Sequence, residues 1–117
     1  MTISANTATA LASAYQNQYV RGLGISLKSR FPSRTHGLQP NELDEFVGGA
    51  LSKCRQYGID QELDVRRFVE LCVLYGPGFD RDLPWAARIL AQEGVSGHER
   101  MRQLDEYELF VLGGGPR

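Results

Sequence analysis

The sequence is poor in the residues that usually hold metals or carry out covalent chemistry. It has two cysteines, Cys54 and Cys72, and two histidines, His36 and His98, and these are too few and too dispersed for a metal site. Both cysteines lie in apolar helical stripes, where a reduced thiol behaves as a small hydrophobic group. We therefore expect buried, reduced cysteines, no metal and no other cofactor.

Long apolar segments are also missing. No run approaches the roughly 18 to 20 apolar residues that cross a bilayer. The opening stretch, MTISANTATALASAY, lacks the basic region and the continuous apolar region of a signal peptide. These absences predict a cytoplasmic protein that does not bind a membrane.

Acidic residues are absent from the first third of the chain. None precedes Glu42, so Arg21, Lys28, Arg30 and Arg34 give that part a charge of +4 and leave −5 on the remainder. The whole chain has a net charge of −1, which argues against a broadly basic nucleic-acid binder. The asymmetry nevertheless predicts one positively charged face.

Length and composition are those of an ordinary globular domain. The chain has 117 residues, of which 42% are hydrophobic and 23% charged, and this balance argues against disorder. We predict an all-α protein, a single-domain bundle of about five helices over residues 1–112, with a flexible tail at residues 113–117.

Two neighbouring helices have the clearest signals. In PNELDEFVGGALSKCRQYG, residues 40–58, the apolar residues recur on one helical face, Pro40 suits the first turn and Gly58 suits a left-handed end. Asp60 is predicted to cap the next helix, residues 61–75, whose last two turns are apolar on nearly every side. This second helix should be the most buried.

The flanking helices are less regular. We predict helices over residues 83–93 and 97–112, the latter opened by Ser96 and Glu99 as a capping box and turning Val111 inward. In the first helix Gly22 and Gly24 predict a kink or break, and Pro32 should end a short following piece at Phe31. Residues 32–39 are predicted to form the longest loop.

The segment LYGPGFDRDLPWAARIL, residues 74–90, poses the question of whether the chain holds an ion. A calcium loop starting at Asp80 fails, because Pro84 and Ala91 stand where oxygen ligands are required, and no lysine and hydroxyl pair follows the GPG to bind phosphate. We interpret the segment as a structural elbow that ends one helix and begins the next. Its expected determinants are Tyr75, Gly76, Phe79, Asp82 as the N-cap, Pro84 and Trp85.

Other motifs do not reach a functional pattern. GLGISLKS, residues 22–29, lacks the second glycine of a phosphate-binding loop, and no strand precedes it. The pair of helices around Gly58 has the layout of a DNA-binding helix-turn-helix, but the second helix carries three acidic and only two basic residues, a balance that does not favour binding to phosphates. His98 is interpreted as a surface residue, and we expect neither enzymatic activity nor nucleic-acid binding.

The chain also resembles a known family. The segments LKSRFP, LDEFV, CRQYGIDQELDVRRFVEL and YGPGFDRDLPWAARIL, followed by MRQL, resemble small all-helical proteins of bacterial type VI secretion effector loci and the helical tail of the adaptor chaperones that load toxins there. The resemblance covers residues 20–105. Its most specific residues are fold determinants: Tyr57, Gly58, Ile59, Gly76, Phe79, Asp80, Pro84 and Trp85. It implies an adaptor or co-chaperone that binds another protein, with no catalytic residue.

Two functions from different classes therefore stay open. The favoured one is a protein-binding accessory factor that assists or regulates effector loading, and the alternative is an immunity protein that neutralises a cognate toxin. The expected partner is an adaptor chaperone or a toxin, and a homodimer is also left open. The predicted partner-binding residues combine aromatic and basic side chains on the first helices: Tyr15, Tyr19, Arg21, Lys28, Arg30 and Arg34.

A less specific alternative exists for that surface. The same residues could form a solvated basic face that packs on the acidic second half of the chain. If the basic residues are not the interface, Leu109, Phe110 and Leu112 at the end of the last helix are the next choice.

Overall fold

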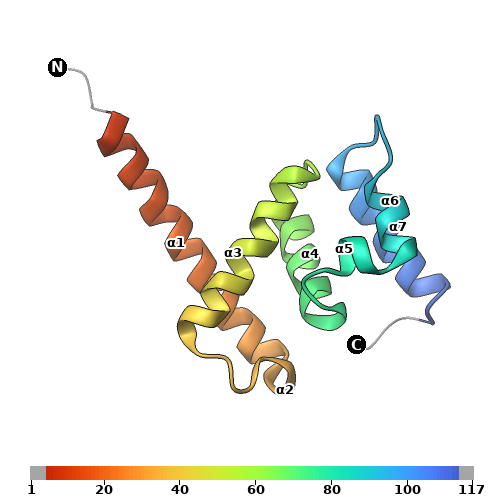
Figure 1. Cartoon of the computed structure of the whole chain (residues 1–117), viewed down its shortest axis with the longest axis horizontal. Helices are drawn as coiled ribbons and strands as arrows, with labels where there is room; N and C mark the ends of the chain where they lie inside the picture. Colours follow the sequence, from red (N-terminus) through yellow and green to blue (C-terminus); the bar gives the residue numbers. More distant parts are fainter. Residues whose placement is uncertain (1–4, 114–117) are drawn as a thin grey trace. The chain divides into compact units, whose positions relative to one another are not determined.

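The computed structural model describes residues 5–113, with side chains from residue 16 onward, and every regular element in that range is a helix (Figure 1). The all-α prediction is confirmed. The described residues form seven helices where about five were predicted, because α2 (Pro32–Thr35) and α5 (Phe79–Asp82) are single turns that the sequence pattern does not reveal.

The chain divides after Val47 into two compact units, which are described separately. The division falls inside α3 (Pro40–Gln56), so that helix contributes its first two turns to the first unit and the rest to the second. The single domain over residues 1–112 stays a prediction. The predicted tail lies outside the described residues from 114 onward.

The first unit contains α1 (Ala5–Arg30), α2 and the beginning of α3. The predicted kink or break at Gly22 and Gly24 is wrong, since α1 runs through both glycines and ends at Arg30. Gly24 is buried against Leu43 of α3, and a Cβ there would lie 3.2 Å from that side chain. The glycine therefore allows two helices to approach closely instead of breaking one of them.

The predicted loop at residues 32–39 is also partly wrong, because it contains α2. Pro32 occupies the first position of this turn, where a missing backbone N–H costs nothing. Buried Thr35 donates a hydrogen bond to the Phe31 carbonyl at 2.9 Å. The backbone then reverses through Gly37, whose φ of 88° favours glycine.

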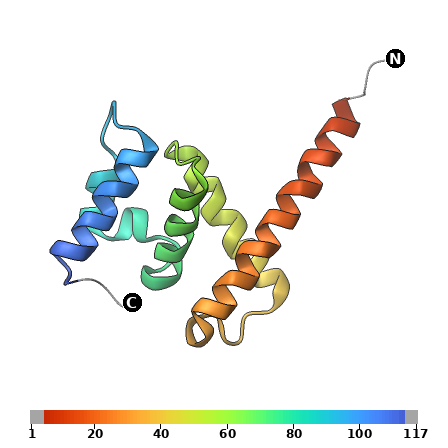
Figure 2. The same ribbon diagram turned by 180° about the vertical axis from the view of Figure 1, so that it is seen from behind.

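The second unit contains the rest of α3 and four further helices, α4 (Glu62–Tyr75), α5, α6 (Pro84–Leu90) and α7 (Gly97–Phe110). α4 packs against α5 and α7, and α6 packs against the same two helices, as the front and back views show (Figures 1 and 2). The largest fully buried apolar side chains in this unit come from three of its helices, α4, α5 and α7: Phe68, Leu71, Phe79, Met101 and Leu104.

α4 is the central helix of the second unit, as predicted. Six of its residues are buried, five of them in one unbroken run: Val65, Phe68, Val69, Glu70, Leu71 and Cys72. Its predicted cap is wrong, because Gln61 and not Asp60 is the N-cap and makes no side-chain hydrogen bond there. The turn before it does use Gly58 with φ of 72°, which places Ile59 N 2.8 Å from the Cys54 carbonyl oxygen.

The last two helices differ from expectation at their ends. α6 stops at Leu90 and not at residue 93. Ser96 caps α7 as predicted, accepting a hydrogen bond from Glu99 N at 3.0 Å. Val111 is 60% exposed instead of inward, because α7 ends at Phe110 and leaves it beyond the last turn, whereas Glu108 is fully buried.

Both cysteine thiols are free and buried, as predicted, and burial raises the pKa of each to about 12. Within residues 5–113, no helix is both long enough and apolar enough to cross a bilayer. The described part of the chain also contains no group of three or more His, Cys, Asp or Glu residues placed to hold a metal ion.

Candidate functional site

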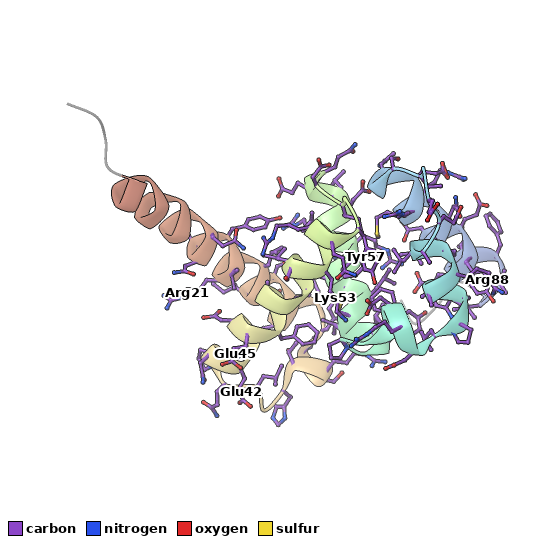
Figure 3. All side chains as sticks on the ribbon, turned by 45° about the horizontal axis from the view of Figure 1, so that its top comes forward. Arg21, Glu42, Glu45, Lys53, Tyr57 and Arg88 are labelled. Atoms are coloured by element: carbon purple, nitrogen blue, oxygen red, sulfur yellow. The ribbon has the colours of Figure 1, made fainter. Side chains whose placement is uncertain are left out.

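The elbow between α4 and α6 is held by a buried carboxylate, Asp80. Lys53 donates hydrogen bonds from Nζ to Asp80 Oδ1 and to the Pro77 carbonyl oxygen, both at 2.6 Å, and Tyr57 donates from its hydroxyl to Asp80 Oδ2 at 2.5 Å. Both donors lie one turn apart at the C-terminal end of α3 (Figure 3). Both carboxylate oxygens of Asp80 are therefore used in internal bonds, and this residue serves the fold.

The pKa values in this cluster follow from the same bonds. Burial alone would raise the pKa of Asp80, but the hydrogen bonds from Lys53 and Tyr57, together with the lysine charge, outweigh it and hold the pKa below its ordinary value. Burial and the bond to Asp80 raise the pKa of Tyr57 to about 12. At neutral pH Asp80 is therefore a carboxylate and Tyr57 a neutral phenol.

Most of the other elbow residues lie as predicted, but Asp82 does not. Gly76 ends α4 with φ of 102°, and Pro84 stands in the first turn of α6. Trp85 is buried and meets Tyr75 edge to face, with ring centroids 6.0 Å apart. Asp82 is not the N-cap of α6, because it closes the extra turn α5 and Leu83 takes the cap position with no side-chain bond.

A second buried acid, Glu108, joins α7 to α4. Its side chain forms an ion pair with Arg67 and accepts a hydrogen bond from the Tyr75 hydroxyl at 2.8 Å. Arg67 also donates to Asp105 Oδ1 at 2.7 Å. Sequence reasoning missed this cluster because Glu108 is polar at a helical position that the tertiary packing turns inward.

The feature best suited to bind another molecule is a groove of about 660 Å³ in the first unit. Its walls come from α1 and from the start of α3, and include Arg21, Gly24, Ile25, Lys28, Pro40, Asn41, Leu43 and Asp44. Ile25, a large apolar side chain, is 71% exposed on the α1 side of this groove. Apolar surface with a few charged groups at its edge is typical of a binding site.

The charges of the groove are unevenly distributed. Arg21 and Lys28 stand on the α1 side, and both are exposed. Asp44 lies on the α3 side, 3.7 Å from Arg21, in a pair whose arginine is 76% exposed. Solvent screens such a pair strongly, so Arg21 stays available to an incoming group, as does the exposed Lys28.

The six predicted partner-binding residues fall into three groups. Arg21 and Lys28 both line the groove. Tyr19 is 36% exposed, the guanidinium carbon of Arg30 lies 5.6 Å from the centroid of the Phe31 ring, and Arg34 belongs to α2. None of these three residues lines the groove. The side chain of Tyr15 lies outside the described residues.

Sequence reasoning overlooked the apolar half of the groove. Ile25 and Leu43 belong to helices that are not consecutive in the chain, so no local pattern brings them together. The sequence did not set Ile25 apart, since the same stretch, GLGISLKSR, also contains Leu23 and Leu27.

The second unit has a smaller hollow of about 370 Å³ where α6 meets the end of α7. Its lining includes Ile89, Tyr107, Phe110 and Val111, with Arg102 and Glu106 beside them. Arg102 is held between Glu99 and Glu106 by hydrogen bonds of 2.8 and 2.6 Å. The neighbouring residues Leu109 and Leu112, named earlier as the second choice for an interface, are 50% and 42% exposed.

Comparison with known proteins leaves the groove without a precedent. No family model matches the chain, and searches of curated proteins and of solved structures found no significant match. The chemistry of the described residues and the resemblance seen in the sequence are therefore the two indications of function.

Proposed function

We propose that this chain is a non-enzymatic, protein-binding accessory factor of the cytoplasm. The observation that carries the proposal is the α1–α3 groove, in which exposed Ile25 lies between Arg21 and Lys28. Apolar surface bordered by arginine and lysine is the composition expected of a protein interface with an acidic partner.

The engagement of the buried acids supports the same proposal. Asp80 and Glu108, the two most buried carboxylates, are both held by basic and tyrosine side chains of the second unit. A general acid or base must reach a substrate, and these groups are occupied and enclosed. The contacts of Asp80 and Glu108 therefore support a structural role for both acids.

The resemblance to proteins of type VI secretion effector loci suggests the setting. On this proposal the chain is a co-chaperone or adaptor that assists or regulates the loading of an effector toxin, and its partner is an adaptor chaperone or the toxin. The resemblance is carried mainly by fold determinants such as Gly76, Phe79 and Trp85. It therefore supports the setting, and the groove supports the mode of action.

A co-purification experiment tests this function. The tagged full chain is expressed in a cell that carries the adaptor and effector genes, and captured proteins are identified by mass spectrometry. Recovery of the adaptor chaperone, alone or with its effector, is the expected result. Recovery of the toxin domain alone, with loss of toxicity, would instead establish an immunity protein, and recovery of neither would refute both functions.

A further inference from the structure

The groove between α1 and α3 has features that specify its occupant, and this inference deepens the proposed function and rests on it. Arg21 and Lys28 are seven residues apart on α1, which places them on one face of the helix and about 10 Å apart along its axis. Gly24 and Ile25 lie between them on the same wall. The wall therefore presents a cation, an apolar step and a second cation.

The possible forms of a peptide ligand can be narrowed by the surroundings. The described residues form no strand, so they offer no sheet edge to which an extended segment could add. The groove lining contains no aromatic ring, and grooves that bind polyproline helices depend on such rings. An amphipathic helix laid into an apolar groove is the remaining common mode, and the volume of about 660 Å³ suits a few apolar anchors.

We propose that the groove binds an amphipathic helix of a partner protein that carries two carboxylates seven residues apart, with apolar anchors between them. The carboxylates meet Arg21 and Lys28, and the anchors pack on Ile25 and Leu43. A Glu or Asp at position i, apolar residues at i+3 and i+4, and a second acid at i+7 form one face of that helix.

The opposite wall of the groove restricts which edge of the bound helix can be acidic. Asp44 lines the groove on the α3 side, and Glu42 and Glu45 are exposed on the same turns (Figure 3). Glu42 already accepts a hydrogen bond from Gln39 N at 2.9 Å. Acidic residues on the second edge of the occupant would be repelled by this wall, so only one edge of the bound helix is acidic.

A second copy of this chain does not fit the same requirement. Its sequence contains a single pair of acids seven residues apart, Glu99 and Glu106. The residues at the anchor positions between them are Arg102 and Gln103, which are polar and hydrogen-bonded to Glu99. The pattern therefore points to a different protein.

Synthetic helical peptides test the inference with the full chain. One alanine-based peptide carries glutamates at i and i+7 and leucines at i+3 and i+4, and a matched peptide carries lysines in place of the glutamates. Binding is measured by fluorescence anisotropy. The glutamate peptide should bind the wild-type chain, more weakly at high salt, and the lysine peptide should bind it at least about tenfold less tightly.

Charge exchange distinguishes a specific contact from general attraction. The double variant Arg21→Glu with Lys28→Glu should lose about tenfold in affinity for the glutamate peptide and gain for the lysine peptide. Ile25→Asp should weaken both peptides. Arg88→Glu, an exposed arginine on α6, is the matched control and should change neither affinity (Figure 3). Circular dichroism verifies that each variant is folded. The salt dependence of glutamate-peptide binding is measured on the wild-type chain, so it tests the inference even if a variant fails to fold.

Several outcomes would overturn the inference. Absence of glutamate-peptide binding, equal binding of both peptides, or a chain dimer that Ile25→Asp dissociates would each do so. In the co-purification experiment, equal capture of the adaptor by the wild type and the double variant would refute the groove but leave the function standing. A successful peptide series without any adaptor capture would refute the function and leave the groove standing.

Discussion

Lys53 and Asp80 are joined by a 2.6 Å hydrogen bond between Nζ and Oδ1, although 27 positions separate them in the chain. The lysine is 24% exposed and the aspartate side chain 2% exposed. Because the same ammonium group binds the Pro77 carbonyl, one side chain of α3 holds both the turn after α4 and the start of α5. The elbow is therefore stabilised from outside its own segment.

Replacing Asp80 should destabilise the second unit more than replacing the nearby Asp82. Asp80→Asn removes the charge that compensates Lys53 while keeping the side-chain shape, and we expect a loss of about 2 to 3 kcal/mol in the free energy of unfolding. Asp82→Asn is the matched control, since Asp82 is exposed, and it should change stability by no more than about 0.5 kcal/mol. Urea denaturation measures both, and equal effects would contradict the role given to Asp80.

The same contact predicts a dependence of stability on acid. Because the folded state lowers the pKa of Asp80, its stabilising effect is complete above the ordinary value of about 3.9 and is lost as pH falls through the folded pKa. The stability difference between wild type and Asp80→Asn should therefore shrink below about pH 4. Denaturation series at several pH values measure it, and a constant difference would show that the carboxylate charge is not the cause.

The opposite shift of Tyr57 predicts a loss of stability in base. Its pKa of about 12 lies above the ordinary value near 10, so the folded state retains the proton and its contribution falls as pH rises from about 10 towards 12. Tyr57→Phe cannot ionise at this position. Relative to its own stability at neutral pH, the variant should therefore lose less stability over that pH range than the wild type does. Parallel alkaline titrations followed by circular dichroism test this, and identical slopes would count against it.

Two glycines should respond to alanine in opposite directions. A Cβ at Gly97 would overlap the Gly58 carbonyl and lie 2.7 Å from Ile59 N, so Gly97→Ala must displace backbone and should cost about 3 kcal/mol or more. Gly49 lies inside α3 with open space around it, and Gly49→Ala should stabilise the helix by about 0.5 to 1 kcal/mol. Thermal unfolding measures the two signs, and a neutral Gly97→Ala would disprove the close approach.

The aromatic residues of the elbow should contribute much of the stability. Phe79 is fully buried against Phe68 with centroids 5.2 Å apart, and Trp85 stacks on Tyr107 at 4.7 Å. Phe79→Ala or Trp85→Ala should each cost about 3 to 5 kcal/mol. Calcium or ATP should leave the wild-type melting temperature unchanged, and a rise of several degrees with either ligand would reject the structural interpretation of this segment.

The helices themselves were largely readable from the sequence. The apolar period of residues 40–58, Pro40 and Gly58 together predicted α3 and its ends, because these signals act within a few residues. Ser96 likewise marked the start of α7. The one-turn helices were missed because four residues are too few to show a period.

For several glycine and aspartate residues, the sequence allowed more than one structural interpretation. The same pattern that allows a break at Gly24 also allows a close helix contact, and only the position of Leu43 decides between them. Asp60 and Asp82 both have good capping chemistry, but the N-cap positions of α4 and α6 lie one residue later, at Gln61 and Leu83.

Of the candidate site, sequence alone determined that basic residues without nearby acids gather before Glu42, since charge is a property of composition. Tertiary structure alone decided which of them share a surface. Arg21 and Lys28 line a groove because α1 continues unbroken through its glycines and the first turns of α3 bring Leu43 and Asp44 beside them. A binding surface of this kind is made by residues distant in sequence, and local propensities carry no information about their meeting.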